Sequence, residues 1–120
     1  MKALFAALVL FAPGLAAAQA SAPPITDPVW TKKPQYSSVL GYYPAEALKV
    51  KAKGQVLLDC LVGGGGALGC TVADEKPNGM GFGEAALKVS REYVIAPQSR
   101  SGASTVGRRV PLLIVFNLGG

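Results

Sequence analysis

Residues Gly54 to Glu75 read GQVLLDCLVGGGGALGCTVADE and contain a run of four glycines and both cysteines of the chain. Apolar residues recur at every second position in each of its halves. Because strand side chains alternate between two faces, residues two apart share one face of a strand. The two halves therefore indicate two half-buried strands. Their inner faces carry Val56, Leu58, Cys60 and Val62 in the first half and Leu68, Cys70 and Val72 in the second.

The linker between the two halves, residues 63–67 (GGGGA), is typical of a hairpin loop. Glycine adopts the positive φ angles that such loops need. An antiparallel register that sets Cys60 opposite Cys70 also aligns the apolar residues of the two strands. We therefore predict a β-hairpin closed by a disulfide between Cys60 and Cys70. The aligned apolar pairs are Leu58 with Val72 and Val62 with Leu68.

The first twenty residues, MKALFAALVLFAPGLAAAQA, have the three parts of a signal peptide. Lys2 supplies the positive end, residues 3–10 form the apolar centre, and the small residues around Gln19 fit a cleavage site. We therefore expect cleavage between Ala20 and Ser21 and export of the mature chain. Two cysteines in an oxidising compartment pair readily, which agrees with the predicted disulfide.

An uncleaved anchor in the inner membrane, through residues 3–19, is the alternative interpretation of this segment. A membrane-spanning helix needs about 18 or more consecutive apolar residues. Pro13 and Gly14 interrupt the apolar run before it reaches that length. The sequence therefore favours the signal peptide over the anchor.

The composition argues against several classes of function. The formal net charge is +5, but the lysines are spaced out and aromatic residues do not alternate with them, so we expect no nucleic-acid partner. Two thiolates in a chain without histidine cannot complete a zinc shell, so we expect no metal and no cofactor. The carboxylates form no recognisable acid–base pair, so we expect no enzyme, no catalytic residue and no small-molecule substrate. From the hairpin onward, these carboxylates are Asp59, Asp74, Glu75, Glu84 and Glu92.

Residues 21–34 (SAPPITDPVWTKKP) are rich in proline and polar residues, which is typical of an extended, flexible tether. Trp30 is the exception, because a lone tryptophan in a tether usually docks onto a surface. That surface belongs either to the domain itself or to a partner. We therefore divide the chain into a signal peptide (1–20), a tether (21–34) and one folded domain (35–120).

Two helices are predicted, one on each side of the hairpin. The first covers residues 45–53 (AEALKVKAK), because Pro44 and Gly54 bracket it as a proline start and a glycine stop. The second runs from Glu84 to about Tyr93, and its apolar residues continue a helical stripe that begins at Phe82.

The chain closes with a third alternating run, residues 108–118 (RRVPLLIVFNL). Pro111 within this run cannot donate to a ladder, so it indicates a strand at the edge of a sheet. The order helix, strand, strand, helix, strand predicts an α+β fold, in which two helices pack on one face of a three-stranded antiparallel sheet. Phe82 and Phe116 are expected in the core between them.

The opposite face of this sheet is predicted to carry Leu57, Leu61, Leu113 and Val115. Such an apolar surface on a soluble monomer usually marks an interaction site. Two interpretations remain open. Either Trp30, Val39 or Leu40 folds back to cover the face, or a partner does.

At this point the sequence resembles the C-terminal domain of the TonB family. The resemblance covers roughly residues 42–118, nearly the whole mature domain, through several short motifs in the right order. The motifs are Tyr43-Pro44-x-x-Ala47, Gly54-x-Val56 with Val62, Gly66-x-Leu68-x-x-x-Val72, Gly81-Phe82-x-x-Ala85-Ala86-Leu87, and Val106-Gly-Arg-Arg-Val110 continuing to Ile114-Val115-Phe116-x-Leu118.

The resemblance implies a periplasmic module that docks an extended peptide, the TonB box of an outer-membrane transporter, beside its last strand. This mode of recognition is β-augmentation, and it agrees with the edge strand indicated by Pro111. The resemblance thus implies a protein or peptide partner and a role linked to transmembrane transport. The implied binding residues are Leu112, Leu113, Ile114, Val115, Phe116 and Asn117.

A second hypothesis is an envelope scaffold that uses the apolar outer face of the sheet and takes no part in energy transduction. A homodimer is a further arrangement that an exposed strand edge allows. The two functional hypotheses differ in one observable feature. The first needs residues 112–118 to form an open edge, whereas the second needs only the face.

Overall fold

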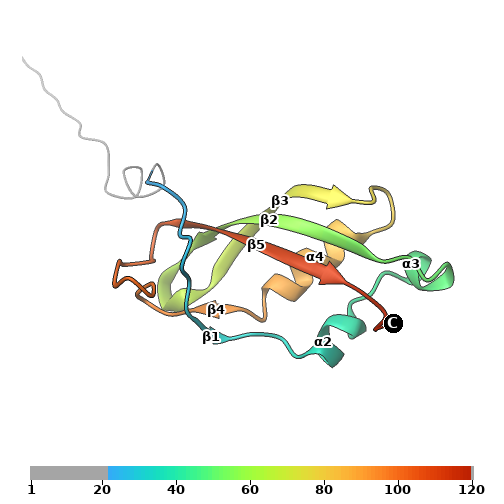
Figure 1. The fold of residues 1–120 in the computed structure, drawn as a ribbon, viewed down its shortest axis with the longest axis horizontal. Helices are drawn as coiled ribbons and strands as arrows, with labels where there is room; N and C mark the ends of the chain where they lie inside the picture. Colours follow the sequence, from blue (N-terminus) through green and yellow to red (C-terminus); the bar gives the residue numbers. More distant parts are fainter. Residues whose placement is uncertain (1–21, 120) are drawn as a thin grey trace, which may run out of the picture.

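The computed structural model describes residues 22–119, so the predicted signal peptide and its cleavage site between Ala20 and Ser21 lie outside the described residues. The described chain forms an α+β fold (Figure 1), as the sequence predicts. The elements in order are β1 (Trp30–Lys32), α2 (Tyr36–Gly41), α3 (Ala45–Lys49), β2 (Gly54–Val62), the 3-10 turn η1 (Gly64–Gly66), β3 (Leu68–Lys76), α4 (Phe82–Ser90), β4 (Val94–Ile95) and β5 (Arg109–Phe116).

The main sheet has three antiparallel strands in the order β3-β2-β5. The predicted hairpin register is confirmed, because Cys60 lies opposite Cys70 and the two form a disulfide with their Cα atoms 4.0 Å apart. The predicted apolar pairs are also present. They are Leu58 with Val72 and Val62 with Leu68.

Glycine is required in the hairpin loop for two reasons. Gly65 and Gly66 have φ angles of 73° and 83°, in the left-handed region that side chains disfavour. A Cβ atom on Gly66 would also collide with the backbone carbonyl of Ile95. The loop therefore closes the hairpin and at the same time packs against β4.

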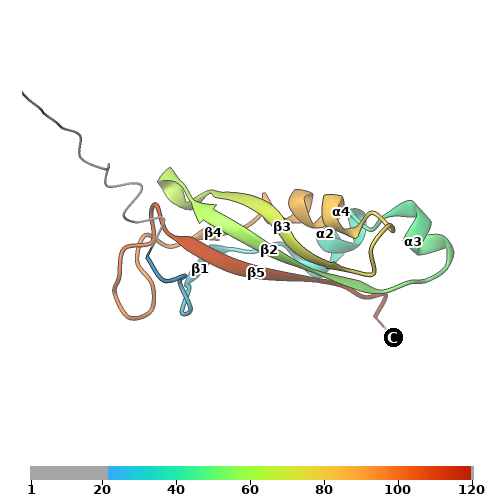
Figure 2. The ribbon, with the colours of Figure 1, turned by 90° about the horizontal axis from the view of Figure 1, so that it is seen from above.

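The helices lie on one side of the main sheet, and Figure 2 shows this layering from above. Phe82 from α4 and Phe116 from β5 are both fully buried between the layers, with ring centroids 5.2 Å apart. Tyr43 packs edge-on against both rings. A Cβ atom on Gly54 would lie 2.6 Å from the Phe82 ring, so the start of β2 needs glycine to pass this cluster. The predicted burial of both phenylalanines is confirmed.

The predicted helix boundaries are partly wrong. The first helix ends at Lys49 instead of residue 53, because Lys51 takes a φ of 54° and turns the chain toward β2. The second runs from Phe82 to Ser90, since Gly81, with a φ of 87°, stands as its N-cap. A third helix, α2, was not predicted from the sequence.

The apolar side chains of β3 are less buried than the alternating sequence pattern predicts. Val72 is 38% exposed, although its side chain faces α4. The pairing of β2 with β3 shifts between Leu57 and Leu58, which leaves Ala73 as an extra residue on β3. Because β3 is also an outer strand of the sheet, α4 covers only part of its inner face.

The expectation of a flexible tether over residues 21–34 is wrong for the part that the structure describes. Ile25 is 1% exposed in the core, and its amide donates to the carbonyl of Arg109 at 2.7 Å. Trp30 belongs to β1, which pairs with β4, and its ring packs edge-on against Tyr93 at 5.1 Å. The tryptophan thus docks onto the domain itself, one of the two alternatives left open.

In the part of the chain from residue 22 to residue 119, no helix has both the length and the apolar character needed to cross a membrane. The disulfide between Cys60 and Cys70 is compatible with an oxidising compartment outside the cytoplasm. Export is therefore consistent with the described fold.

Candidate functional site: an open strand edge

The backbone of β5 presents alternate residues to its two sides. The last residue pair between β2 and β5 is Leu61 with Arg109. One residue further along, the amide of Val62 donates to the carbonyl of Arg108 at 2.9 Å. Because the register has no shift along these two strands and bonding alternates with period two, even-numbered residues of β5 turn their polar backbone groups toward β2. These residues are Val110, Leu112, Ile114 and Phe116.

The odd-numbered residues of β5 consequently face the open side of the sheet. The hydrogen bond from the Ile25 amide to the Arg109 carbonyl confirms this direction. Pro111 presents a carbonyl but has no N–H to offer, as its edge position allows. Leu113 and Val115 each present an N–H and a C=O group, and within residues 22–119 neither has a backbone partner on that side.

The same odd-numbered residues point their side chains to the outer face of the sheet. Leu113 is 51% exposed and Val115 is 52% exposed, and Leu57 and Leu61 of β2 are exposed beside them. Trp30 and Val39 pack against the buried core instead of covering these residues. Among the described residues, the outer face is therefore an uncovered apolar surface that borders the open edge.

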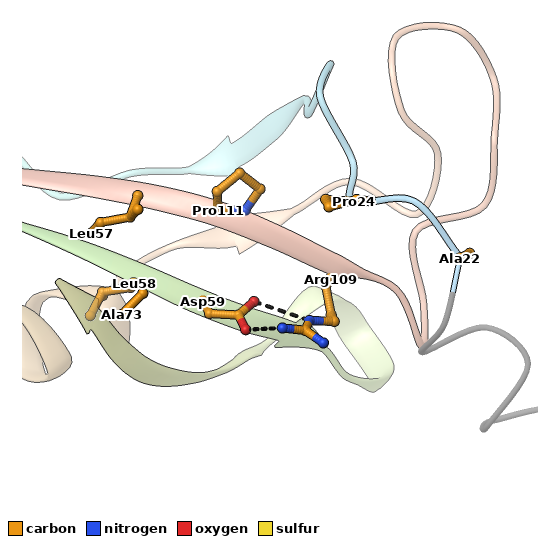
Figure 3. Close-up of a pocket in the computed structure, with 8 residues that line it drawn as sticks. All are labelled: Ala22, Pro24, Leu57, Leu58, Asp59, Ala73, Arg109 and Pro111. Carbon is orange, nitrogen blue, oxygen red and sulfur yellow. Dashed lines mark hydrogen bonds and ion pairs between the residues drawn. The ribbon is translucent and has the colours of Figure 1, made fainter.

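A shallow groove of about 470 Å³ lies on this outer face, as Figure 3 shows. Asp59 accepts two hydrogen bonds from the guanidinium of Arg109 at its rim, one from Nε at 3.2 Å and one from Nη2. This contact raises the pKa of Arg109 above its ordinary value, first through the hydrogen bond and then through the charge of Asp59. The groove is lined by Ala22, Pro24, Leu57, Leu58, Asp59, Ala73, Arg109 and Pro111.

The other edge of the sheet, on β3, is protected against pairing. The extra residue at Ala73 disrupts its regularity. Three charged residues follow directly, Asp74, Glu75 and Lys76. Bulges and charges are the devices with which natural sheets prevent unwanted pairing at an edge. The edge of β5 has no charge between Val110 and Phe116, so it is the edge suited to a partner strand.

The loop that precedes β5 is fixed by Asp27. Its carboxylate accepts a hydrogen bond from the amide of Ser101 at 2.7 Å, and its carbonyl accepts one from the amide of Arg100. The hydrogen bonds from Ser101 lower the pKa of Asp27, because they favour the charged carboxylate. This contact holds residues 97–107 in place and so positions the start of β5.

The site residues predicted from the sequence divide into two groups. Leu112, Ile114 and Phe116 are buried, and they support the edge from the core without facing a partner. Leu113 and Val115 form the exposed edge itself. Asn117 lies at its end, where its carbonyl accepts a hydrogen bond from the hydroxyl of Tyr36 at 2.9 Å.

Sequence reasoning missed Ile25 and Tyr36, which contact β5 from the N-terminal side of the chain. The signal for Ile25 was a large β-branched apolar residue, followed by a second at Val29, within a proline-rich segment, which is unusual in a solvated tether. Tyr36 carried no comparable signal. Over the described residues, no group of three or more histidine, cysteine, aspartate or glutamate side chains could hold a metal ion.

Comparison with known proteins gave neither a matching family model nor a matching curated protein.

Proposed function

We propose that the protein is a periplasmic, TonB-like binding module that accepts an extended peptide as an additional strand beside β5. The partner is a segment of the TonB-box type in an outer-membrane transporter or another envelope protein, which links the module to transmembrane transport. The observation that carries this proposal is that the N–H and C=O groups of Leu113 and Val115 on the open side of the sheet have no backbone partner within residues 22–119.

The edge offers five backbone groups to a partner strand: the carbonyls of Pro111, Leu113 and Val115, and the amides of Leu113 and Val115. A hydrogen bond of this kind contributes about 0.5–1.5 kcal/mol net. Ordering a flexible peptide offsets much of this sum. We therefore expect a weak and reversible complex, in which apolar contacts with Leu113 and Val115 supply part of the affinity.

The envelope scaffold is the second candidate, and the exposed apolar face favours it. This face includes Leu57 and Leu61 on the central strand β2, which an added strand beside β5 would not contact directly. A protein that docks flat onto the sheet would bury these two leucines. Leu61→Lys therefore tests the face while leaving the edge unchanged.

The edge is tested by Leu113→Pro. Because the amide of Leu113 points away from β2, a proline should leave the sheet intact, as Pro111 does, while removing one of the two donors. The matched control is Leu113→Ala, which shortens the side chain but keeps the amide. The probe is a labelled seven-residue peptide of alternating valine and threonine, and its affinity is measured by fluorescence anisotropy.

We expect Leu113→Pro to weaken binding of this peptide about tenfold or more, from the lost hydrogen bond and the clash with the proline ring. Leu113→Ala should retain most of the affinity. Unchanged binding by a folded Leu113→Pro variant, together with loss of binding in Leu61→Lys, would show that the face is the site and the edge is not.

A further inference from the structure

The segment from Ala22 to Tyr36, which we name the strap, crosses the start of β5 and then runs past its open side in the same direction as that strand (Figure 1). It contacts the edge of β5 at two places, Ile25 at Arg109 and Tyr36 at Asn117. Between these contacts the strap forms β1 and pairs with β4 instead. The strap is therefore fixed at both ends of the edge and leaves the middle free.

The first contact is firmly anchored and cannot extend. The side chain of Ile25 is buried in the core, and the carbonyl of Pro23 accepts a hydrogen bond from Nη2 of Arg108 at 2.6 Å. In a parallel ladder, a residue that donates to the carbonyl of residue 109 accepts its next bond from the amide of residue 111. Because residue 111 is proline, the carbonyl of Ile25 has no donor there, and pairing of the strap with β5 stops after one bond.

The second contact, between Tyr36 and Asn117, closes the other end of the open edge. The hydroxyl of Tyr36 occupies the outward carbonyl of Asn117, and the side chain of Asn117 accepts a hydrogen bond from the amide of Gly119 at 2.9 Å. The chain turns at this point, and a Cβ atom on Gly119 would lie only 2.8 Å from the Tyr36 hydroxyl. A partner strand that reached Asn117 would meet the tyrosine.

We infer that the strap sets the length of the strand that the edge accepts, with Tyr36 as a specificity-determining residue. The free window runs from Pro111 to Val115, which is five residues. At about 3.3 Å per residue, this window pairs with roughly five residues of a partner, and further residues gain no backbone bonds. This inference depends on the proposed peptide docking and adds the limits of the docked strand.

The experiment measures affinity against peptide length. The probes are labelled peptides of alternating valine and threonine, with five, seven and nine residues. The native protein is expected to bind all three within about twofold of one another, because one hydrogen bond at ~1 kcal/mol would already change affinity about fivefold. Tyr36→Ala opens the Asn117 end, so its nine-residue complex should be at least threefold tighter than its five-residue complex.

Tyr36 is 56% exposed, so its truncation should leave the fold intact. The control is Leu48→Ala, at an exposed apolar residue of α3, which should keep the native dependence on length. Affinity that rises steadily with length in the native protein, or an unchanged length dependence in Tyr36→Ala, overturns the inference while leaving peptide docking in place. Absence of binding by all peptides in every variant instead overturns the proposed function, and the window with it.

Discussion

Phe116→Ala is expected to lower the free energy of unfolding by about 3–5 kcal/mol, the range for large-to-small changes at fully packed aromatic residues. The Phe116 ring is fully buried and lies in one cluster with Phe82 and Tyr43. Its removal would leave a cavity among the packed rings, and such cavities collapse only in part. Urea unfolding followed by circular dichroism measures the loss.

The control for this prediction is Leu118→Ala, at an exposed residue just beyond β5. Surface changes of this kind are usually within about 0.5 kcal/mol. Phe82→Ala should resemble Phe116→Ala, and the double variant should lose less than the sum, because the two rings share one cluster. A loss below about 1 kcal/mol for Phe116→Ala would show that the core has been wrongly assigned.

Reduction of the disulfide between Cys60 and Cys70 is the second large effect. The bond closes a short loop with a sequence separation of 10, and the chain-entropy model gives roughly 2.5–3 kcal/mol for such a loop. Parallel urea unfolding with and without reductant measures the difference on the same protein. Intact mass confirms the redox state in each sample.

The matched control is the double variant Cys60→Ala with Cys70→Ala, which should be insensitive to reductant. Its stability in the absence of reductant should fall to that of the reduced native protein or slightly lower, since Cys60 is fully buried and its sulfur also packs in the core. Two free thiols in protein purified from an exported fraction would contradict the disulfide.

The hairpin could be predicted from the sequence because its information is local. Alternation, the glycine loop and the position of Cys60 against Cys70 all specify one register, and a shift by one residue would turn every apolar side chain to the wrong face. Pro111 likewise indicated an edge strand from its own chemistry. These features need no knowledge of the rest of the chain.

The strap could not be predicted in the same way. The pairing of β1 with β4 involves only two residue pairs and depends on contacts such as Trp30 with Tyr93, which lie far apart in sequence. Proline-rich composition normally indicates a tether, and the burial of Ile25 overrides it through tertiary packing. The end of α3 was also predicted wrongly. The chain turns at Lys51 with a positive φ, and a lysine at such a position gives no sequence signal for a turn, whereas a glycine would.

The candidate site was predicted as one continuous run, residues 112–117. In the structure, even-numbered and odd-numbered residues of this run face opposite sides of the strand. Even-numbered residues bond to β2 and fill the core, and odd-numbered residues face the open side of the sheet. This division depends on the pairing of β5 with β2, and a sequence cannot specify which neighbour a strand has. The resemblance pointed to strand β5, and only the pairing in the sheet shows which of its backbone groups are free within residues 22–119.

Amide hydrogen exchange at single residues of β5, with and without the five-residue peptide, shows whether the edge of β5 is open and whether the peptide docks there. We expect slow exchange at Leu112 and Ile114 in the free protein, because these amides face β2, and fast exchange at Leu113 and Val115. Saturating peptide should slow exchange at Leu113 and Val115 and leave Leu112 and Ile114 unchanged. Exchange at Leu113 and Val115 that is already as slow as at Ile114 without peptide, or that stays fast while bound peptide protects residues elsewhere, would contradict an open edge as the docking site.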